Sequence, residues 1–367
     1  DVYPKRPAAP CIDWYTFNRS VVVHVENIAQ YKAYHQDEKW KDYEYATTQD
    51  KVTYEWVGET SVKVVGNEAE VGDRLVVPAR VTLDGYTFDV TSIDNEALNG
   101  KAEEIVVKAP VTSIGHTGEV SGCLTPFPNL KRITLPETLQ RIEYLQFFNA
   151  PLEEITLPKN VSYIGFGAFA HTSIKSIVIP EGVDTVRSGT FENCRYLMSL
   201  QFPKNLKVIE NEKYIRHHVY DRENKWSDHG PISFLGTFYG THIEEITLPD
   251  GVEDIAEDAF YGNDGLKAFH VKGEHYFDRD GVLMHRTSAD KGNRLVLVKY
   301  PEAKKDKEYT VADDVDSLGC NAFYGVKMEV LNLSSSIKWI RGLEFSNSGQ
   351  VNIPEGPVGL ADRAFYG

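Results

Sequence analysis

Cysteine is scarce in this sequence, and its four cysteines do not pair by spacing. They are Cys11, Cys123, Cys194 and Cys320, with no C-x-x-C among them. Clustered thiols are the usual ligands of a structural zinc ion, so such a site is not expected. Cys194 and Cys320 fall on the repeat described below, where a small buried thiol is favoured over a disulfide. For Cys11 and Cys123 both states stay open.

Long apolar runs are also missing. No stretch approaches the roughly 18 apolar residues of a spanning helix, so no membrane-spanning segment is expected. The opening residues, DVYPKRPAAPC, hold no apolar secretory segment. We therefore expect any signal or anchor segment to lie outside this chain.

Positive charge is in deficit. Lys and Arg number 39 against 54 Asp and Glu, which gives a net charge of −15. Because binding to a nucleic-acid backbone needs clustered Lys and Arg, nucleic acid is not expected as a partner. The acidic balance favours solubility outside the cell, or a partner with basic patches.

Motifs of the common catalytic sites are missing too. The sequence has no Gly-rich phosphate loop, no H-E-x-x-H and no G-x-S-x-G. Carboxylates are abundant, but a glycosidase pair must face each other roughly 5–10 Å apart across a groove, and no such groove is indicated. We expect no enzymatic activity, no cofactor and no metal ion.

What the sequence does contain is an internal repeat with the frame L-x-x-I-x-L-P-x-x-V-x-x-I-x-x-x-A-F. Clear copies begin at Leu130, Leu152, Ile174 and Ile243. The frame's proline slot is filled by Thr87, Lys108, Pro136, Pro158, Pro180, Pro203, Pro249, Lys272, Ala312, Ser334 and Pro354. This series predicts about eleven units from about residue 80 to the end.

The frame predicts which side chains are buried. Alternate residues of a strand point to opposite faces, so Ile133 and Leu135 should point inward and Thr134 outward. The following proline ends the strand because it has no amide donor. One unit cannot bury its apolar side alone, so stacked units should form a ladder of the closing aromatics. These are Phe147, Phe169, Phe191, Phe238, Phe260, Phe323, Phe345 and Phe365.

The frame, together with the ending AFYG, resembles the BspA-like leucine-rich repeats, a 22–23-residue class found in surface proteins of Bacteroidetes. The segment DRDGVLMHRTSADKGNRLVLVKYP is similar to a hairpin insert of that family. The resemblance implies a β-rich leucine-rich-repeat solenoid, right-handed, with about eleven coils and an N-terminal β cap. It also implies adhesion or recognition at the cell surface, and no active site.

Three regions are expected along the chain. Residues 1–41 form an N-terminal extension outside the frame. Residues 42–80 form a β capping segment, which covers the apolar flank of the first coil. Residues 81–367 form the solenoid. Repeat steps longer than the period place inserts near 116–127, 211–234 and 273–308, and long loops on a rigid scaffold often carry function.

The second insert is the first candidate binding site. Adjacent histidines point apart on most backbones and the spacing matches no metal-ligand pattern, so metal binding is disfavoured. Tyr and Trp supply rigid contact area, which favours contact with a protein or glycan. The candidate residues are His217, His218, Tyr220, Trp226 and His229.

The outward face of the predicted strands is the second candidate. A shallow polar face suits an extended partner, while a merely solvated face is the alternative. The candidate contacts are Arg132, Thr134, Glu154, Thr156, Gln201, Glu245, Thr247 and His270.

These observations favour a non-enzymatic binding protein, secreted or at the cell surface, that recognises an extracellular protein or glycan. Two alternatives stay open. The solenoid could be a structural spacer that presents another domain, or the inserts could build an enzymatic cleft. The sequence does not specify the ligand, the anchoring or the oligomeric state.

Overall fold

Short strands recur at the period of the repeat, and each stands beside its counterpart from the neighbouring unit. The structure is a computed structural model. It describes residues 22–24, 32–33, 44–57, 59–68, 72–83, 85–94, 97–98, 101–115, 127–210, 214–215, 219–220, 226–227, 232–233, 235–340, 348–355 and 359–360.

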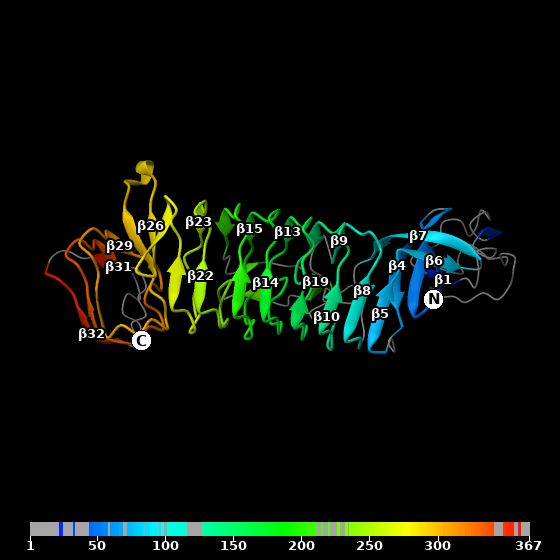
Figure 1. The fold of residues 1–367 in the computed structure, drawn as a ribbon, viewed down its shortest axis with the longest axis horizontal. Helices are drawn as coiled ribbons and strands as arrows, with labels where there is room; N and C mark the ends of the chain where they lie inside the picture. Colours follow the sequence, from blue (N-terminus) through cyan, green and yellow to red (C-terminus); the bar gives the residue numbers. More distant parts are fainter. Residues whose placement is uncertain are drawn as a thin grey trace.

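The first row of strands carries the I-x-L part of the frame and lies along the long axis of the molecule (Figure 1). Its sheets are β5–β8–β10–β12, β14–β16, β22–β24 and β28–β30–β32, paired in parallel. The strands are β5 (Arg74–Val77), β8 (Glu104–Val107), β10 (Arg132–Thr134), β12 (Glu154–Ile155), β14 (Ser176–Val178), β16 (Ser199–Gln201), β22 (Glu245–Thr247), β24 (Ala268–His270), β28 (Glu308–Thr310), β30 (Met328–Asn332) and β32 (Ser348–Asn352).

The second row carries the later apolar pair of each unit. Its strands are β9 (Ser113–Ile114), β11 (Arg141–Ile142), β13 (Tyr163–Ile164), β15 (Thr185–Val186), β17 (Val208–Ile209), β23 (Asp254–Ile255), β29 (Ser317–Leu318), β31 (Trp339–Ile340) and β33 (Gly359–Leu360). Val208 pairs with Asp254 across the second insert. The long step from Pro203 to Pro249 is therefore one coil of the structure plus an insert.

A six-stranded sheet precedes the rows, in the order β1–β2–β3–β4–β7–β6. It lies at the N-terminal end of the array (Figure 1). Its strands are β1 (Val22–His24), β2 (Glu44–Gln49), β3 (Val52–Trp56), β4 (Ser61–Asn67), β6 (Arg80–Leu83) and β7 (Tyr86–Ile93). Buried residues of this sheet belong to the same core as the solenoid coils.

The repeat unit predicted at Thr87 is wrong. Thr87 lies in β7, which pairs with β6 and β4 in the N-terminal sheet. The strand beside β8 is β5, with Val77 opposite Val107. The position that matches Lys108 is therefore Pro78, 30 residues earlier. The residues around Thr87 match the frame, but pairing between distant strands places β5, and not β7, beside β8.

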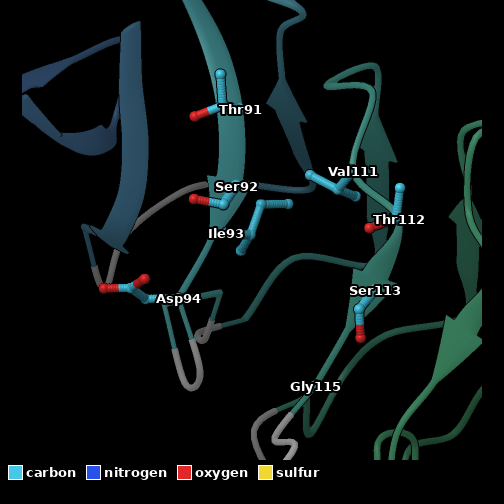
Figure 2. Close-up of a pocket in the computed structure, with 8 residues that line it drawn as sticks. All are labelled: Thr91, Ser92, Ile93, Asp94, Val111, Thr112, Ser113 and Gly115. Atoms are coloured by element: carbon cyan, nitrogen blue, oxygen red, sulfur yellow. The ribbon is translucent and has the colours of Figure 1, made fainter. Parts of the chain in front are cut away.

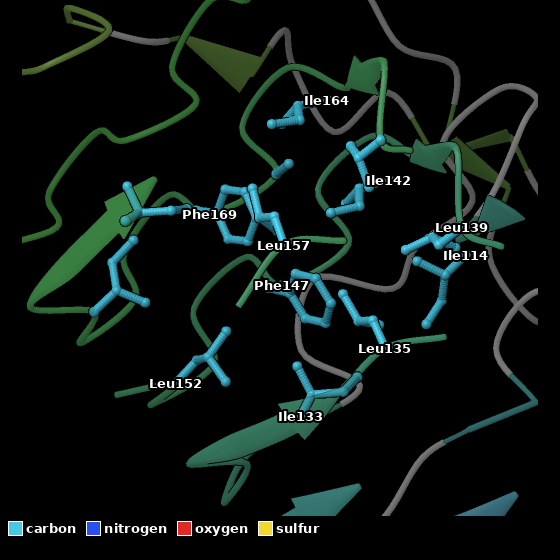
Figure 3. Packing of buried hydrophobic residues seen from close by; sticks show 14 of the residues in the cluster. Ile114, Ile133, Leu135, Leu139, Ile142, Phe147, Leu152, Leu157, Ile164 and Phe169 are labelled. Atoms are coloured by element: carbon cyan, nitrogen blue, oxygen red, sulfur yellow. The ribbon is translucent and has the colours of Figure 1, made fainter. Parts of the chain in front are cut away.

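Inside the coils the predicted burial is confirmed. Ile133 and Leu135 are buried and Thr134 is exposed. Figure 3 shows these aliphatic side chains packed around Phe147 and Phe169. The phenylalanine ladder is continuous over five units. Its successive ring centroids lie 5.6, 6.0, 5.9 and 5.2 Å apart from Phe147 to Phe260. Phe345 and Phe365 lie outside the described residues.

The turn after each ladder phenylalanine explains the ending F-Y-G. The residue two positions after the phenylalanine has a positive φ in every coil where the structure describes it. Such a conformation favours glycine, and tolerates Asn and His better than branched residues. The occupants are Asn149, His171, Asn193, Gly240, Gly262 and Gly325.

The third insert contributes strands to a sheet that continues into the second row. β25 (Tyr276–Arg279), β26 (Val282–Arg286) and β27 (Leu295–Lys299) form an antiparallel sheet, and β27 then pairs in parallel with β29. The hairpin projects beyond the second row (Figure 1). Two separate hydrophobic clusters meet at this insert, one ending near Leu283 and Val298 and the other beginning at Val282.

The buried thiol expected on the repeat is confirmed for Cys194. Cys194 is fully buried and forms no disulfide, and Cys320 is half-buried. The Cys194 thiol donates to the carbonyl of Phe169 at 3.0 Å. Burial raises the pKa of Cys194 to about 12, so this thiol is inert. Cys11 and Cys123 lie outside the described residues.

Candidate recognition surfaces

The candidate contacts on the strand face share one exposed surface along the first row. All eight predicted residues are exposed: Arg132, Thr134, Glu154, Thr156, Gln201, Glu245, Thr247 and His270. Pairing places Arg132 between Glu104 and Glu154, and Thr247 beside His270. The strand register thus lines these residues up in two columns, because side chains two apart share a face.

The structure adds a third column that the sequence analysis missed. It runs just before the strands and alternates in charge from unit to unit, because the step of the repeat superposes these positions. Ion pairs join Lys131 to Glu103 at 3.0 Å, Lys175 to Glu153 at 3.4 Å and Lys267 to Glu244 at 2.6 Å. Each pair is exposed and contributes little stability. These ion pairs therefore set the charge pattern of the surface and add little to the free energy of folding.

Met198 interrupts the charged column in the middle of the array. Its amide donates to the carbonyl of Lys175 at 3.0 Å, and the repeat step places Glu244 at the same position of the next coil, so Met198 stands between a basic and an acidic residue. Met198 is 63% exposed. Tyr196 and Val178, in the same two coils, are 59% and 58% exposed. Exposed Tyr and Met side chains are enriched where proteins bind each other. A comparison of equivalent positions in the sequence could have found this break.

Of the candidate residues in the second insert, the structure describes the backbone of Tyr220 and Trp226. His217, His218 and His229 lie outside the described residues. Tyr220 of β19 (Val219–Tyr220) pairs with Trp226 of β20 (Trp226–Ser227) in an antiparallel pair. β18 (Tyr214–Ile215) pairs in the same way with β21 (Ile232–Ser233). Within the described residues, every strand of the insert pairs with another strand of the insert.

A buried carboxyl group stands where the second insert rejoins the solenoid. Glu192 is 5% exposed and accepts a hydrogen bond from the amide of Leu235 at 2.9 Å. Burial raises the pKa of Glu192 to about 7, although backbone donors oppose the rise. The Glu192 carboxyl group therefore connects the end of the second insert, at Leu235, to the coil that carries Phe191.

The second row carries a stacked cluster around Tyr163. The guanidinium carbons of Arg141 and Arg187 lie 3.8 and 4.2 Å from the centre of the Tyr163 ring. Arg141 donates to buried Glu143 at 2.6 Å, and this bond raises the pKa of Arg141. Ser113 donates to the same carboxylate at 2.9 Å. These contacts join consecutive coils of the second row.

A polar cavity of about 550 Å³ marks the junction between the N-terminal sheet and the solenoid. Figure 2 shows Thr91, Ser92 and Asp94 on one side, and Thr112 and Ser113 on the other. Their polar atoms already have partners in part. Asp94 pairs with Lys63 at 3.0 Å, and Thr91 donates to a backbone carbonyl at 3.3 Å. The cavity therefore offers little unpaired chemistry to a ligand.

Two further properties concern only the part of the chain that the structure describes. In it, no group of three or more His, Cys, Asp or Glu side chains could hold a metal ion. Nor is any helix there long and apolar enough to cross a membrane.

Comparison with known proteins relates this geometry to a family. The model of the BspA type leucine rich repeat region matches the chain in six copies, over residues 120–218, 235–275 and 302–367, more than half of the chain. No curated protein sequence matches the chain.

Solved structures share the fold. A leucine rich cell surface protein from Faecalibacterium prausnitzii A2-165 is 20% identical with a TM-score of 0.65, covering 87% of this chain and 85% of that one. A leucine-rich repeat protein from Bacteroides ovatus is 20% identical with a TM-score of 0.55, covering 86% and 76%. The pneumococcal vaccine antigen PcpA is 18% identical with a TM-score of 0.56, covering 84% and 70%. At these identities the likeness concerns the fold alone.

Proposed function

Because this chain belongs to the BspA-type leucine-rich repeat family, we propose that it is a non-enzymatic binding protein, secreted or at the cell surface, that recognises an extracellular protein. Its structural neighbours include a cell surface protein and a vaccine antigen, which supports the surface location. Its net charge of −15 favours solubility of the protein outside the cell.

The observation that carries the proposal is the apolar break in the charged column. Met198, Tyr196 and Val178 expose large apolar side chains on two adjacent coils, between ion pairs on either side. Binding energy at interfaces concentrates in a few central apolar or aromatic residues that a polar rim surrounds. The surface therefore suits an extended protein segment with apolar side chains at its centre and charges of both signs towards its ends.

The test compares binding by the chain and by Met198→Glu, against a panel of extracellular-matrix and bacterial surface proteins. Glu at this position would lie on an exposed surface between Lys175 and Glu244 of the flanking coils, where a single substitution changes stability little, so the fold should be unaffected. Binding should weaken by at least about tenfold, or about 1.4 kcal/mol. Asp254→Asn, exposed on the second row, is the matched control and should bind as the unmodified chain does.

The other outcomes separate the alternatives. Binding that is unchanged in Met198→Glu but lost when residues 211–230 are replaced would move the site to the second insert. Binding to glycans instead of proteins would contradict the proposed partner class. No binding to any panel member would favour the spacer, which presents another domain.

We also infer that the chain divides into an N-terminal extension over residues 1–41, a β cap that begins at residue 42 and a solenoid that follows the cap. The first coil's strand β5 has an apolar side that must be covered, and the sheet shares its core. Because β7 reaches Ile93, the cap proposed here extends past residue 80.

A further inference from the structure

The third insert interrupts the second row and leaves a pocket in the gap. In this row β23 is followed in space by the hairpin strands and β29, and the hairpin folds over the end of β23. The resulting cavity has a volume of about 400 Å³. This size lies within the range of about 300–1,000 Å³ that is usual for small-molecule sites.

Strand alternation decides which hairpin residues line the pocket. His285 stands opposite Val296, and the amide of Thr287 donates to the carbonyl of Arg294 at 2.9 Å. These residues share one face of the hairpin and line the pocket. The intervening residues Met284, Leu295 and Leu297 point the other way and are buried in the second core cluster.

The floor of the pocket is flat and largely apolar. The rings of Tyr276 and His285 stack with centroids 4.4 Å apart and planes 7° from parallel. The Tyr276 hydroxyl accepts a hydrogen bond from the amide of Ile255 at 3.1 Å, which fixes the ring. Burial lowers the pKa of His285, and nearby His275 adds to the effect, so the imidazole is uncharged at neutral pH.

The rim of the pocket carries charge of mostly one sign. Lys291 and Arg294 are exposed lining residues, and within the described part of the chain neither has a carboxylate partner within 4 Å. Glu257 is the acidic lining residue. Two cations and one carboxylate leave one net positive charge, which suits a monoanion better than a dianionic phosphate.

Hydroxyl groups complete the lining. The Thr287 oxygen accepts the amide of Arg294 at 2.8 Å, so its proton stays available to a ligand. Ser317 adds a second hydroxyl group. Together with the His285 nitrogen and the Glu257 carboxylate, they offer hydrogen bonds to a ligand that carries several hydroxyl groups of its own.

We propose that this pocket binds an acidic sugar of the uronic acid class. The sugar carboxylate pairs with Arg294 and Lys291, its hydroxyl groups bond to Thr287, Ser317 and Glu257, and its apolar face packs on the floor. The site is separate from the strand face and does not depend on the function proposed for that face.

The experiment is titration calorimetry of the full chain with methyl β-D-glucuronide. Methyl β-D-glucoside tests the carboxylate, cyclohexanecarboxylate tests the hydroxyl groups, and glucose 6-phosphate tests the preference for a single negative charge. We expect the glucuronide to bind at least about tenfold more tightly than each of the three.

Arg294→Gln should weaken glucuronide binding by at least about tenfold, because it removes a charge-assisted hydrogen bond. Arg286→Gln is the matched control, since Arg286 is an exposed arginine of the same hairpin outside the lining. It should bind as the unmodified chain does. Equal binding of the glucoside, the carboxylate or the phosphate, unchanged binding by Arg294→Gln, or no glucuronide binding at about 10 mM would each overturn the proposal.

Discussion

The Lys299 ammonium lies 2.9 Å from a carboxylate oxygen of Glu302, and the two side chains are only 5% and 3% exposed. The ammonium also donates to the carbonyl of Tyr324 at 3.3 Å, and the carboxylate accepts the amide of Gly262 at 3.1 Å. The pair therefore bridges the coils on either side of the third insert, where the hydrophobic core is divided. Burial lowers the pKa of Lys299 despite the attraction of Glu302.

Glu302→Gln should destabilise the protein by about 3–5 kcal/mol, because it removes the carboxylate that is paired with the buried Lys299 charge. The shift of the urea midpoint measures the loss. The double variant Lys299→Met with Glu302→Gln should recover most of it, since a buried pair is often replaced by uncharged groups at little cost. A single variant as stable as the unmodified chain would show that the pair is not buried in solution.

Glu192 should make stability depend on pH. Its pKa rises from an ordinary value of 4.5 to about 7 in the folded state. The folded state thus binds the proton more tightly, which contributes stability below about pH 4.5 that is lost as the pH rises through about 7. Glu192→Gln removes this loss and should be more stable at pH 8 by about 2–3 kcal/mol relative to the difference at pH 4.

The check on Glu192 is thermal unfolding of both proteins at pH 4, 6 and 8. Glu137→Gln, at an exposed position of the same repeat array, is the control and should follow the unmodified chain. A constant difference between Glu192→Gln and the unmodified chain at all three values would show that the carboxyl does not titrate in this range.

Phe191 lies in the middle of the aromatic ladder, between Phe169 at 6.0 Å and Phe238 at 5.9 Å. Phe191→Ala should cost about 3–5 kcal/mol, because it opens a cavity that neighbouring coils cannot fill. Phe191→Leu should cost less, since it keeps more of the volume. Chemical unfolding measures both. A loss under about 1 kcal/mol for the alanine variant would mean that the ladder is not close-packed.

Gly262 is required by both conformation and space. Its φ is +66°, and an added Cβ would overlap the ring of Tyr239. Gly262→Ala should therefore lower the unfolding free energy by at least about 1–3 kcal/mol. Gly251→Ala is the control, because its nearest neighbour would be the flexible Lys207 ammonium at 3.7 Å. It should change stability by less than about 0.5 kcal/mol.

Replacing residues 211–230 with a short Gly-Ser linker should leave folding nearly intact. Val208 already pairs with Asp254 and Ile209 with Ile255, so the ladder closes without the insert. Loop closure changes only slowly with loop length. Circular dichroism and the melting temperature test this directly. A large loss of the β-strand signal in circular dichroism, or a large fall in the melting temperature, would mean that the insert belongs to the core.

The sequence by itself determined the repeating part of this protein. The spacing of Ile133, Leu135 and Phe147 dictated which side chains are buried, because each choice depends on strand alternation and a fixed period. The glycine of the F-Y-G ending, as at Gly262, followed from a turn that the same period repeats.

Only the tertiary structure decided where the period fails. At Thr87 the local pattern fitted the frame, but hydrogen bonds between distant strands placed β5 beside β8. The pocket of His285 and Arg294 likewise required the hairpin to fold over β23, which no local spacing specifies. Repeats can be predicted from sequence because each unit packs on a neighbouring unit with the same pattern. An insert packs on residues that are distant in the sequence and share no pattern with it.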